Sequence, residues 1–186
     1  MRRKDREMGV DFALEVIDKA QYGVLSMVDG EEAYGIPLSI VRDGNSLYFH
    51  SAMDGRKVRI FERNPKVSIA FVGDVKVPEL YSKEELEEIA KDESKIGLLI
   101  SKVFTTEYES AVVKGRIALV EDEEERIKAL RLICEKYTPS KMDYFHLAIK
   151  PGLNRTNIYR IEMEEIKAKR KKYDKDGEEM KWGRME

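Results

Sequence analysis

Residues 47–57 read Leu-Tyr-Phe-His-Ser-Ala-Met-Asp-Gly-Arg-Lys, and the fold can be worked out from this stretch. Its aromatic and apolar first half predicts a β-strand that ends at an imidazole and a hydroxyl, those of His50 and Ser51. A turn with glycine follows and leads into a short helix, for which Asp54 is the expected N-cap. The stretch therefore predicts a strand, a turn and a helix with polar side chains at their junction.

The start of this helix has the chemistry of an anion site. The first turn of any helix carries free backbone N–H groups and the positive end of the helix dipole. Arg56 and Lys57 add charge-assisted donors at this position, and Ser51 adds a hydroxyl donor. The pattern favours a phosphate-binding site, although a surface helix with ordinary solvated cations has the same residues.

Short extended runs surround this unit and predict an antiparallel β fold. Residues 23–28, 33–41 and 46–51 are joined by turns rich in Asp and Gly, which predicts a meander. Pro37 in the second run indicates an edge strand or a break in the ladder. The other elements that we expect are strands at 67–72, 108–120, 146–149 and 156–163 and helices at 11–20, 54–63, 82–93 and from 122 onward.

The chain is expected to form one domain, residues 1–186, of mainly β structure with flanking helices. Sequential antiparallel strands suit a small closed barrel, which leaves no open sheet edge. We expect the charged segment 77–101 to be an insertion between strands and the charged tail 167–186 to be loose at its end. Two pairs at capping-box spacing mark helix starts, namely Ser82 with Glu85 and Asp122 with Glu125.

Composition narrows the class of function. The 34 Lys and Arg nearly balance the 36 Asp and Glu, which counts against a nucleic-acid partner although both ends are basic. The single cysteine, Cys134, excludes an internal disulfide, and the two histidines are too far apart to indicate a metal site. No apolar run is long enough to span a membrane, so we expect a cytoplasmic protein without a membrane partner. Many lysines and glutamates with few side-chain amides are typical of thermophiles.

Several motifs follow one another in an order that resembles a known family. They span residues 10 to 167 and are Tyr34-Gly35-Ile36-Pro37-Leu38-Ser39, Leu47-Tyr48-Phe49-His50-Ser51-Ala52, Gly55-Arg56-Lys57, Arg63-Asn64-Pro65, Tyr108-Glu109-Ser110-Ala111-Val112-Val113-Lys114-Gly115-Arg116 and Tyr159-Arg160-Ile161-Glu162. This order is similar to that of the pyridoxamine-phosphate-oxidase-like, FMN-binding split-barrel superfamily, in particular the group related to 5-nitroimidazole resistance proteins. The resemblance implies a six-stranded antiparallel split β-barrel that forms a homodimer and binds FMN at the subunit interface.

The resemblance also implies roles for the junction residues. Ser51 and Lys57, together with Arg56, are expected to hold the FMN phosphate. His50 is expected to lie near the cofactor and is the candidate for proton handling in catalysis. A histidine on a strand is often only a structural group, so a structural role for His50 stays open at this point.

The flavin ring is implied to lie against a second strand. The backbone of Pro37, Leu38 and Ser39 is expected to run along the isoalloxazine ring, and a ladder interrupted at Pro37 leaves backbone groups free for a ligand. Ser110 and Val112 are expected to approach the ring across the dimer interface. The inserted segment 77–101 departs from typical members of the superfamily, and it is a candidate lid or dimer arm.

Two functions remain open. The first is an FMN-dependent oxidoreductase that reduces a small organic substrate, in which the flavin carries the hydride or electrons and the protein binds and orients it. The second is a flavin- or haem-binding carrier or sensor without turnover, because relatives with this barrel bind haem or a deazaflavin in place of FMN.

Overall fold

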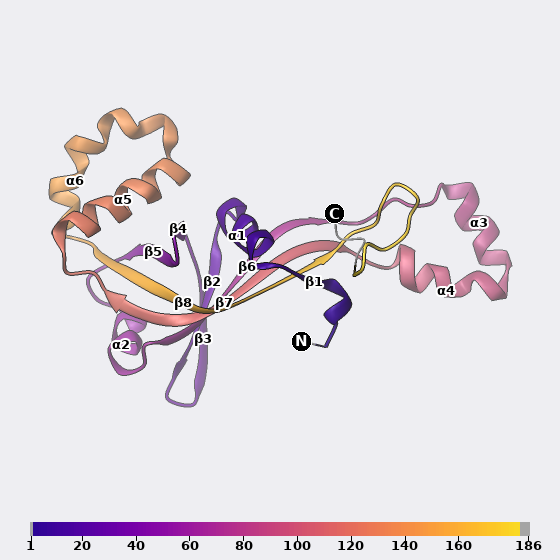
Figure 1. Ribbon diagram of the computed structural model, residues 1–186, viewed down its shortest axis with the longest axis horizontal. Coiled ribbons are helices and arrows are strands. Elements are labelled where there is room, and N and C mark those ends of the chain that lie inside the picture. The colour runs from indigo at the N-terminus through magenta and orange to yellow at the C-terminus, as the bar shows by residue number, and fades with distance from the viewer. Residues whose placement is uncertain (1, 183–186) are drawn as a thin grey trace.

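The computed structural model describes residues 2–182 and is built on one antiparallel β-sheet (Figure 1). The strands lie in the order β3-β2-β6-β7-β8-β5-β4, and β1 pairs with the far end of β8. Their bounds are β1 Glu7–Met8, β2 Gly23–Asp29, β3 Glu32–Leu38, β4 Val41–Asp43, β5 Ser46–Ser51, β6 Lys66–Lys76, β7 Glu107–Leu119 and β8 Asn157–Lys171. The α-helices are α1 Val10–Lys19, α2 Arg56–Arg63, α3 Lys83–Lys91, α4 Ile96–Leu98, α5 Glu123–Tyr137 and α6 Phe145–Leu153, and short turns η1 Lys4–Arg6, η2 Glu93–Lys95, η3 Leu99–Val103 and η4 Pro139–Tyr144 connect them.

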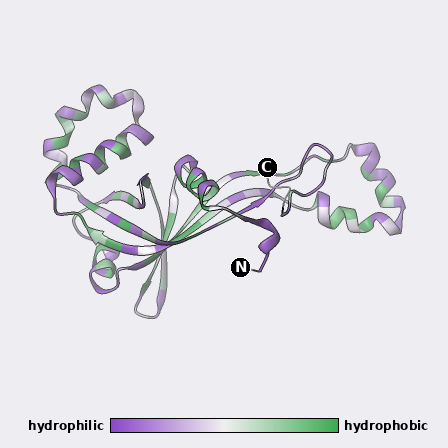
Figure 2. Cartoon of the chain, viewed as in Figure 1, coloured by the Kyte–Doolittle hydropathy of each residue, from purple (hydrophilic) through white to green (hydrophobic). Residues whose placement is uncertain are grey.

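The three longest strands, β6, β7 and β8, lie side by side and form the spine of the sheet. Along β7, buried Ala111 and Val113 alternate with exposed Val112 and Lys114, as expected for a strand with one face on the core. Figure 2 shows the same alternation of hydrophobic and hydrophilic residues along the central strands. The period-two pattern that predicted this strand from the sequence is therefore confirmed.

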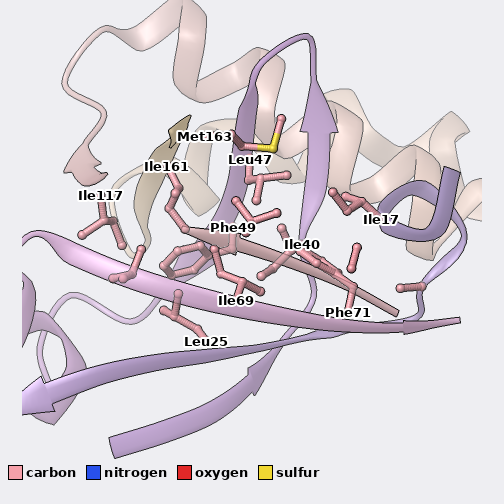
Figure 3. Packing of buried hydrophobic residues seen from close by; sticks show 14 of the residues in the cluster. Ile17, Leu25, Ile40, Leu47, Phe49, Ile69, Phe71, Ile117, Ile161 and Met163 are labelled. Atoms are coloured by element: carbon pink, nitrogen blue, oxygen red, sulfur yellow. The ribbon is translucent and has the colours of Figure 1, made fainter. Parts of the chain in front are cut away.

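The hydrophobic core lies against the inner face of this sheet and is closed by α1 and α2 (Figure 3). Ala13 and Val16 of α1 are buried because residues three apart share one face of a helix. At the other end, Phe49, Phe61 and Tyr159 form a cluster of rings whose centroids are 4.9–6.1 Å apart. Edge-to-face and stacked contacts of this kind stabilise a core beyond the area they bury.

The six-stranded barrel expected from the sequence is not confirmed. The sheet has eight strands, and within residues 2–182 no ladder joins β3 to β4, the strands at its two ends. The run 33–41 breaks into β3 and β4 at residues 39 and 40, after Pro37, because Ile40 bonds to a side chain instead of a strand. The edge position expected for Pro37 is confirmed, since β3 is an edge strand.

Two other local expectations are wrong. Residues 146–149 belong to α6, because a short apolar run does not by itself distinguish a buried strand from a helix. Asp54 is not the N-cap of α2: Gly55 takes that place with a φ of 143°, and Asp54 pairs with Arg59 at 3.0 Å. Asp122 does cap α5, but the carboxylate of Glu125 accepts bonds from other side chains and only half of that capping box forms.

The insertion expected at 77–101 lies between β6 and β7 and projects from the body of the molecule (Figure 1). It contains α3, whose capping box of Ser82 and Glu85 is present as expected, followed by the turns of α4 and η3. Within residues 2–182, no helix is both long enough and apolar enough to cross a membrane.

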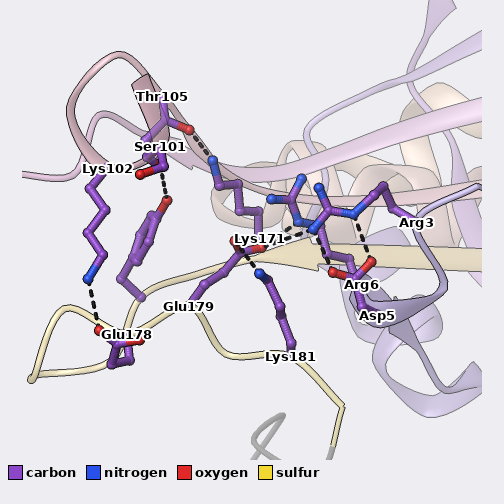
Figure 4. Close-up of polar contacts among 11 residues, drawn as sticks. Arg3, Asp5, Arg6, Ser101, Lys102, Thr105, Lys171, Glu178, Glu179 and Lys181 are labelled. Atoms are coloured by element: carbon purple, nitrogen blue, oxygen red, sulfur yellow. Dashed lines mark hydrogen bonds and ion pairs between the residues drawn. The ribbon is translucent and has the colours of Figure 1, made fainter. Parts of the chain in front are cut away.

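The C-terminal segment is described as far as Trp182, and the end that is expected to be loose, residues 183–186, lies outside the described residues. β8 continues to Lys171, and beyond it the hydroxyl of Tyr173 donates to the backbone of Ser101 at 2.7 Å. Lys102 pairs with Glu178 at 2.8 Å, so this segment fastens the root of the projecting insertion (Figure 4). Lys171 is itself buried and donates to Thr105.

The bulge between β7 and β8, where Glu164 of β8 is the extra residue, provides a test of the packing. The register between β7 and β8 shifts at Gly115, where a Cβ would overlap the backbone carbonyl of Glu162. We expect Gly115→Ala to lower the free energy of unfolding by about 1–3 kcal/mol, the usual cost of overpacking. Gly35→Ala is the matched strand control, because its Cβ would meet nothing closer than 3.8 Å. Equal urea midpoints for the two variants would contradict this account of the bulge.

Candidate functional site

An open hollow lies at the end of edge strand β3. It has a volume of about 610 Å³ and is lined by Tyr22, Val24, Pro37, Leu38 and Ser39. The side chain of Tyr22 is 55% exposed, so a flat face of the ring is available to a ligand. Because β3 has a neighbour on one side only, its outer backbone groups can also bond to a ligand. The three residues expected beside a flavin ring therefore line one hollow.

The chain that leaves this hollow is fixed by α5. The hydroxyl of Tyr137 accepts from the backbone N–H of Ile40 at 2.9 Å and donates to its carbonyl at 2.8 Å. Lys136 donates to the same carbonyl at 3.1 Å and to that of Ile17 at 3.3 Å. Burial raises the pKa of Tyr137 and lowers the pKa of Lys136.

Ser51 and Lys57 both belong to the strand–turn–helix junction, Ser51 at the end of β5 and Lys57 in the first turn of α2. Ser51 is buried at the end of β5, and its hydroxyl donates to the carbonyl of Ala52 at 2.9 Å. Lys57 lies in the first turn of α2 and is partly buried. Within residues 2–182, no carboxylate forms an ion pair with Lys57, which makes its charge available to an anion.

Arg56, the other cation of this turn, has protein partners. It donates to Asp29 at 2.9 Å and to Glu32 at 2.5 Å, and its guanidinium lies 4.6 Å from the ring centroid of Tyr34. Hydrogen bonds from Arg56 and then Arg63 lower the pKa of Asp29. These contacts tie α2 to the hairpin of β2 and β3, so Arg56 serves the architecture of the junction in this conformation.

His50 points away from Ser51, because successive strand residues face opposite sides. Its ring lines a second pocket, about 250 Å³ in volume, between β5 and the helices α5 and α6. Partial desolvation, followed by the positive charge of Lys57, lowers the pKa of His50. The imidazole is therefore neutral at pH 7 and can both donate and accept a hydrogen bond.

Ser110 and Val112 lie on the outer face of β7. Val112 pairs with Ala70 of β6, and Ala70 pairs in turn with Val24 of β2, so the three residues lie side by side across the sheet. Since neighbouring strands are about 4.8 Å apart, Val112 lies about 10 Å from the wall of the hollow on the same face of the sheet. The two residues expected at a dimer interface thus share an exposed face with the hollow.

Sequence reasoning missed the role of Tyr137 and Lys136. Both lie in a helix whose apolar spacing was correctly predicted, but no local pattern indicates that their polar ends reach a strand break 97 and 96 residues away. Among the residues that the structure describes, no group of three or more His, Cys, Asp and Glu is arranged to hold a metal.

The family model of pyridoxamine 5′-phosphate oxidase matches residues 10–170. The chain belongs to this family. The resemblance expected from the motifs is thereby confirmed. No curated protein sequence matches the chain significantly.

Solved structures share the fold of this family member. A proposed 5-nitroimidazole antibiotic resistance protein from Bacteroides thetaiotaomicron is 20% identical, with a TM-score of 0.65 over 88% of this chain and 85% of that one. An FAD and heme binding protein from Mycobacterium smegmatis is 12% identical, with a TM-score of 0.69 over 89% and 73%. An FAD-binding protein from Mesorhizobium loti is 18% identical, with a TM-score of 0.58 over 90% and 98%.

The pKa of His50 gives a prediction for this site. Because its folded pKa lies below its unfolded value, the folded chain binds fewer protons, and this contribution to stability is lost as pH falls below the unfolded pKa. We expect an NMR titration to show a depressed pKa for His50 and Lys57→Met to raise it, since the neighbouring charge is removed. The chain has two histidines, and the imidazole signal that remains in His146→Gln is that of His50. A His50 pKa that does not move in Lys57→Met would show that the two side chains do not interact.

Proposed function

We propose that this protein is an FMN-dependent oxidoreductase that acts on a small organic substrate as a homodimer. The observation that carries the proposal is that β3 has the hollow at Pro37–Ser39 at one end and the first turn of α2, fastened to Glu32, at the other. The cation of that turn, Lys57, forms no ion pair among residues 2–182. A flavin mononucleotide needs a seat for a planar ring and a seat for a phosphate dianion. Membership in the pyridoxamine 5′-phosphate oxidase family supports the same cofactor class.

The proposed ring seat is the hollow itself. Its walls combine apolar surface from Val24 and Leu38 with an aromatic ring from Tyr22, and the edge of β3 supplies backbone donors and acceptors. A small number of fixed polar groups in a mainly apolar hollow is the usual composition of a cofactor site. The contacts of Tyr137 and Lys136 with Ile40 keep this backbone in place before a ligand arrives.

The proposed phosphate seat is the first turn of α2. Lys57 would neutralise part of the dianion, and the free backbone N–H groups of the turn would bond to its oxygens. Ser51 can turn its hydroxyl from Ala52 to the phosphate, since its present acceptor is a neighbouring carbonyl. Arg56 contributes at longer range through its charge, because its donors are engaged by Asp29 and Glu32.

When bound, flavin supplies hydride or electron transfer, and the side chains of this chain supply the surroundings. In the proposed step, His50 takes up a proton from water at its exposed side and delivers it, as imidazolium, to the reduced substrate, which leaves the imidazole neutral again. The proposed role of His50 rests on its lowered pKa and on its position in a pocket.

The proposed dimer interface is the outer face of β2, β6 and β7. Val72 and Val112 on this face are 53% and 41% exposed, although both belong to strands in the middle of the sheet. Exposed apolar patches of this kind mark interaction sites in proteins. A two-fold axis through the face would bring Ser110 and Val112 of one chain toward the hollow of its partner.

One alternative is supported by a specific likeness. The similar Mycobacterium smegmatis protein binds FAD and heme, so a carrier or sensor of flavin or haem without turnover would also fit this fold. The visible spectrum of the purified protein separates these functions. Flavin absorption bands that bleach when a reduced nicotinamide is added, and return when an electron acceptor is added, support the oxidoreductase. A Soret band, or a bound flavin that is never turned over, supports the carrier.

The phosphate seat makes a quantitative prediction. Removing one charge-assisted bond in Lys57→Met should weaken FMN about 10- to 100-fold, since such a bond contributes roughly 1.5–3 kcal/mol. Riboflavin lacks the phosphate, so its affinity should hardly change. Lys95→Met on the projecting insertion is the control, because Lys95 pairs with Asp92 far from this turn in the sequence. An FMN-to-riboflavin affinity ratio that is the same in Lys57→Met and wild type would remove Lys57 from the site.

The dimer face makes a second prediction. We expect Val72→Lys to produce a monomer in light scattering, because a charge would have to be desolvated in the middle of the interface. Bound FMN should be lost with the dimer. Val10→Lys is the matched control, since Val10 is also exposed, at 55%, but lies on α1. A dimeric Val72→Lys protein, or a wild-type monomer that keeps one FMN per chain, would contradict the proposed interface.

A further inference from the structure

The second pocket, which we call the α5–α6 pocket, is separate from the hollow at β3. Its walls are Leu130 and Ile133 of α5 together with Phe145 and Ile149 of α6, and His50 closes it on the side of the sheet. The pocket has a volume of about 250 Å³. This space between two helices and a strand is open to solvent and has room for a small molecule.

The pocket has a closed floor and an open mouth. Ile133 and Phe145 are buried at its base, and the guanidinium of Arg131 lies 4.7 Å from the ring centroid of Phe145, which holds that ring in position. His50 and Ala148 are exposed at its rim. A molecule can therefore enter beside Ala148 without unfolding either helix.

The chemistry of the walls selects an uncharged ligand. Among the described residues that line the pocket, none is Asp, Glu, Lys or Arg, so an ion would lose hydration without gaining a partner there. The polar groups of the lining are the imidazole of His50, the hydroxyl of Thr156 and the weakly polar thiol of Cys134. A neutral imidazole can both donate to and accept from one polar group of a ligand.

The volume sets the size of the ligand. A water molecule takes about 30 Å³ of liquid volume, so the pocket holds roughly eight to ten non-hydrogen atoms. A single substituted aromatic ring has this size and presents flat apolar faces to leucine, isoleucine and phenylalanine walls.

We infer that the α5–α6 pocket binds a small, uncharged, single-ring organic molecule whose one polar group is held by His50. This binding goes beyond the proposed function, because no residue of the pocket belongs to the proposed ring seat or phosphate seat, and only His50 has a role in the proposed reaction. The ligand would bind whether or not flavin is present. If the protein is an oxidoreductase, this is the class of molecule that it concentrates beside His50.

Cys134 provides a reporter of occupancy, since it lines the pocket and is the only cysteine of the chain. We expect N-ethylmaleimide to label Cys134 in the full-length protein, and phenol or toluene to slow the labelling saturably. At a probe concentration ten times its dissociation constant, the rate should fall about tenfold by mass action. Benzoate has a similar ring but carries a charge, and it should not slow labelling at the same concentration.

Variants at the mouth of the pocket test whether the probes slow labelling by binding there. Ala148→Trp should block the mouth, slow labelling without any probe and remove the further effect of phenol. Leu147→Trp is the matched control, because Leu147 is the preceding residue of α6, is 66% exposed and does not line the pocket. Circular dichroism checks that both variants fold. If Ala148→Trp does not fold, the labelling rates of wild type with phenol, toluene and benzoate still test the inference.

The role of His50 has its own readout. His50→Leu should keep the protection by toluene and lose the preference for phenol over toluene by about three- to tenfold, the effect of one hydrogen bond. The inference is overturned if no probe slows labelling, if benzoate protects as well as phenol, or if Ala148→Trp responds like wild type. It is also overturned if Cys134 reacts only after unfolding, since a second copy or the chain itself would then cover the pocket. Flavin content, measured in the same samples, reports separately on the proposed cofactor site.

Discussion

The structure depends on the contact between the side chain of Tyr137 and the backbone of Ile40. The chain must leave β3 at one end of the sheet and start β4 at the other, and at Ile40 it has no strand to bond to. Tyr137 satisfies both the N–H and the carbonyl of that residue, and Lys136 adds a charge-assisted bond to the carbonyl. An unpaired buried peptide group costs about 1–3 kcal/mol, so this contact offsets the cost of the break between β3 and β4 at the buried residue Ile40.

The same helix organises both hollows of the molecule. The C-terminal end of α5 holds the break beside Pro37–Ser39, and its middle turns line the α5–α6 pocket next to His50. Its N-terminal end accepts bonds from Tyr48 and Arg160 through Glu125. A rigid element that contacts two sites keeps their separation constant, which a cofactor site and a neighbouring small-molecule pocket both require.

Much of this architecture follows from sequence patterns that act over short distances. Alternating side chains predicted β7, and the glycine turn before Arg56 predicted the junction with α2. The patterns failed where a distant partner decides the outcome. Residues 146–149 have the apolar run of a strand but fold as α6 on α5. Arg56 has the right spacing for an anion, yet Asp29 and Glu32 of a neighbouring hairpin engage it. The opposite orientations of His50 and Ser51 follow from strand geometry once the boundaries of β5 are known.

The central claim is that a flavin ring lies against the open edge of β3 with its phosphate at α2. Hydrogen exchange with and without FMN tests this claim most directly, because backbone amides that bond to a ligand exchange more slowly. The account predicts slower exchange on adding FMN at residues 36–40 and in the first turn of α2, with little change in the centre of α3 on the projecting insertion. Protection confined to α5 and α6, or spread evenly over the sheet with none at residues 36–40, would contradict it.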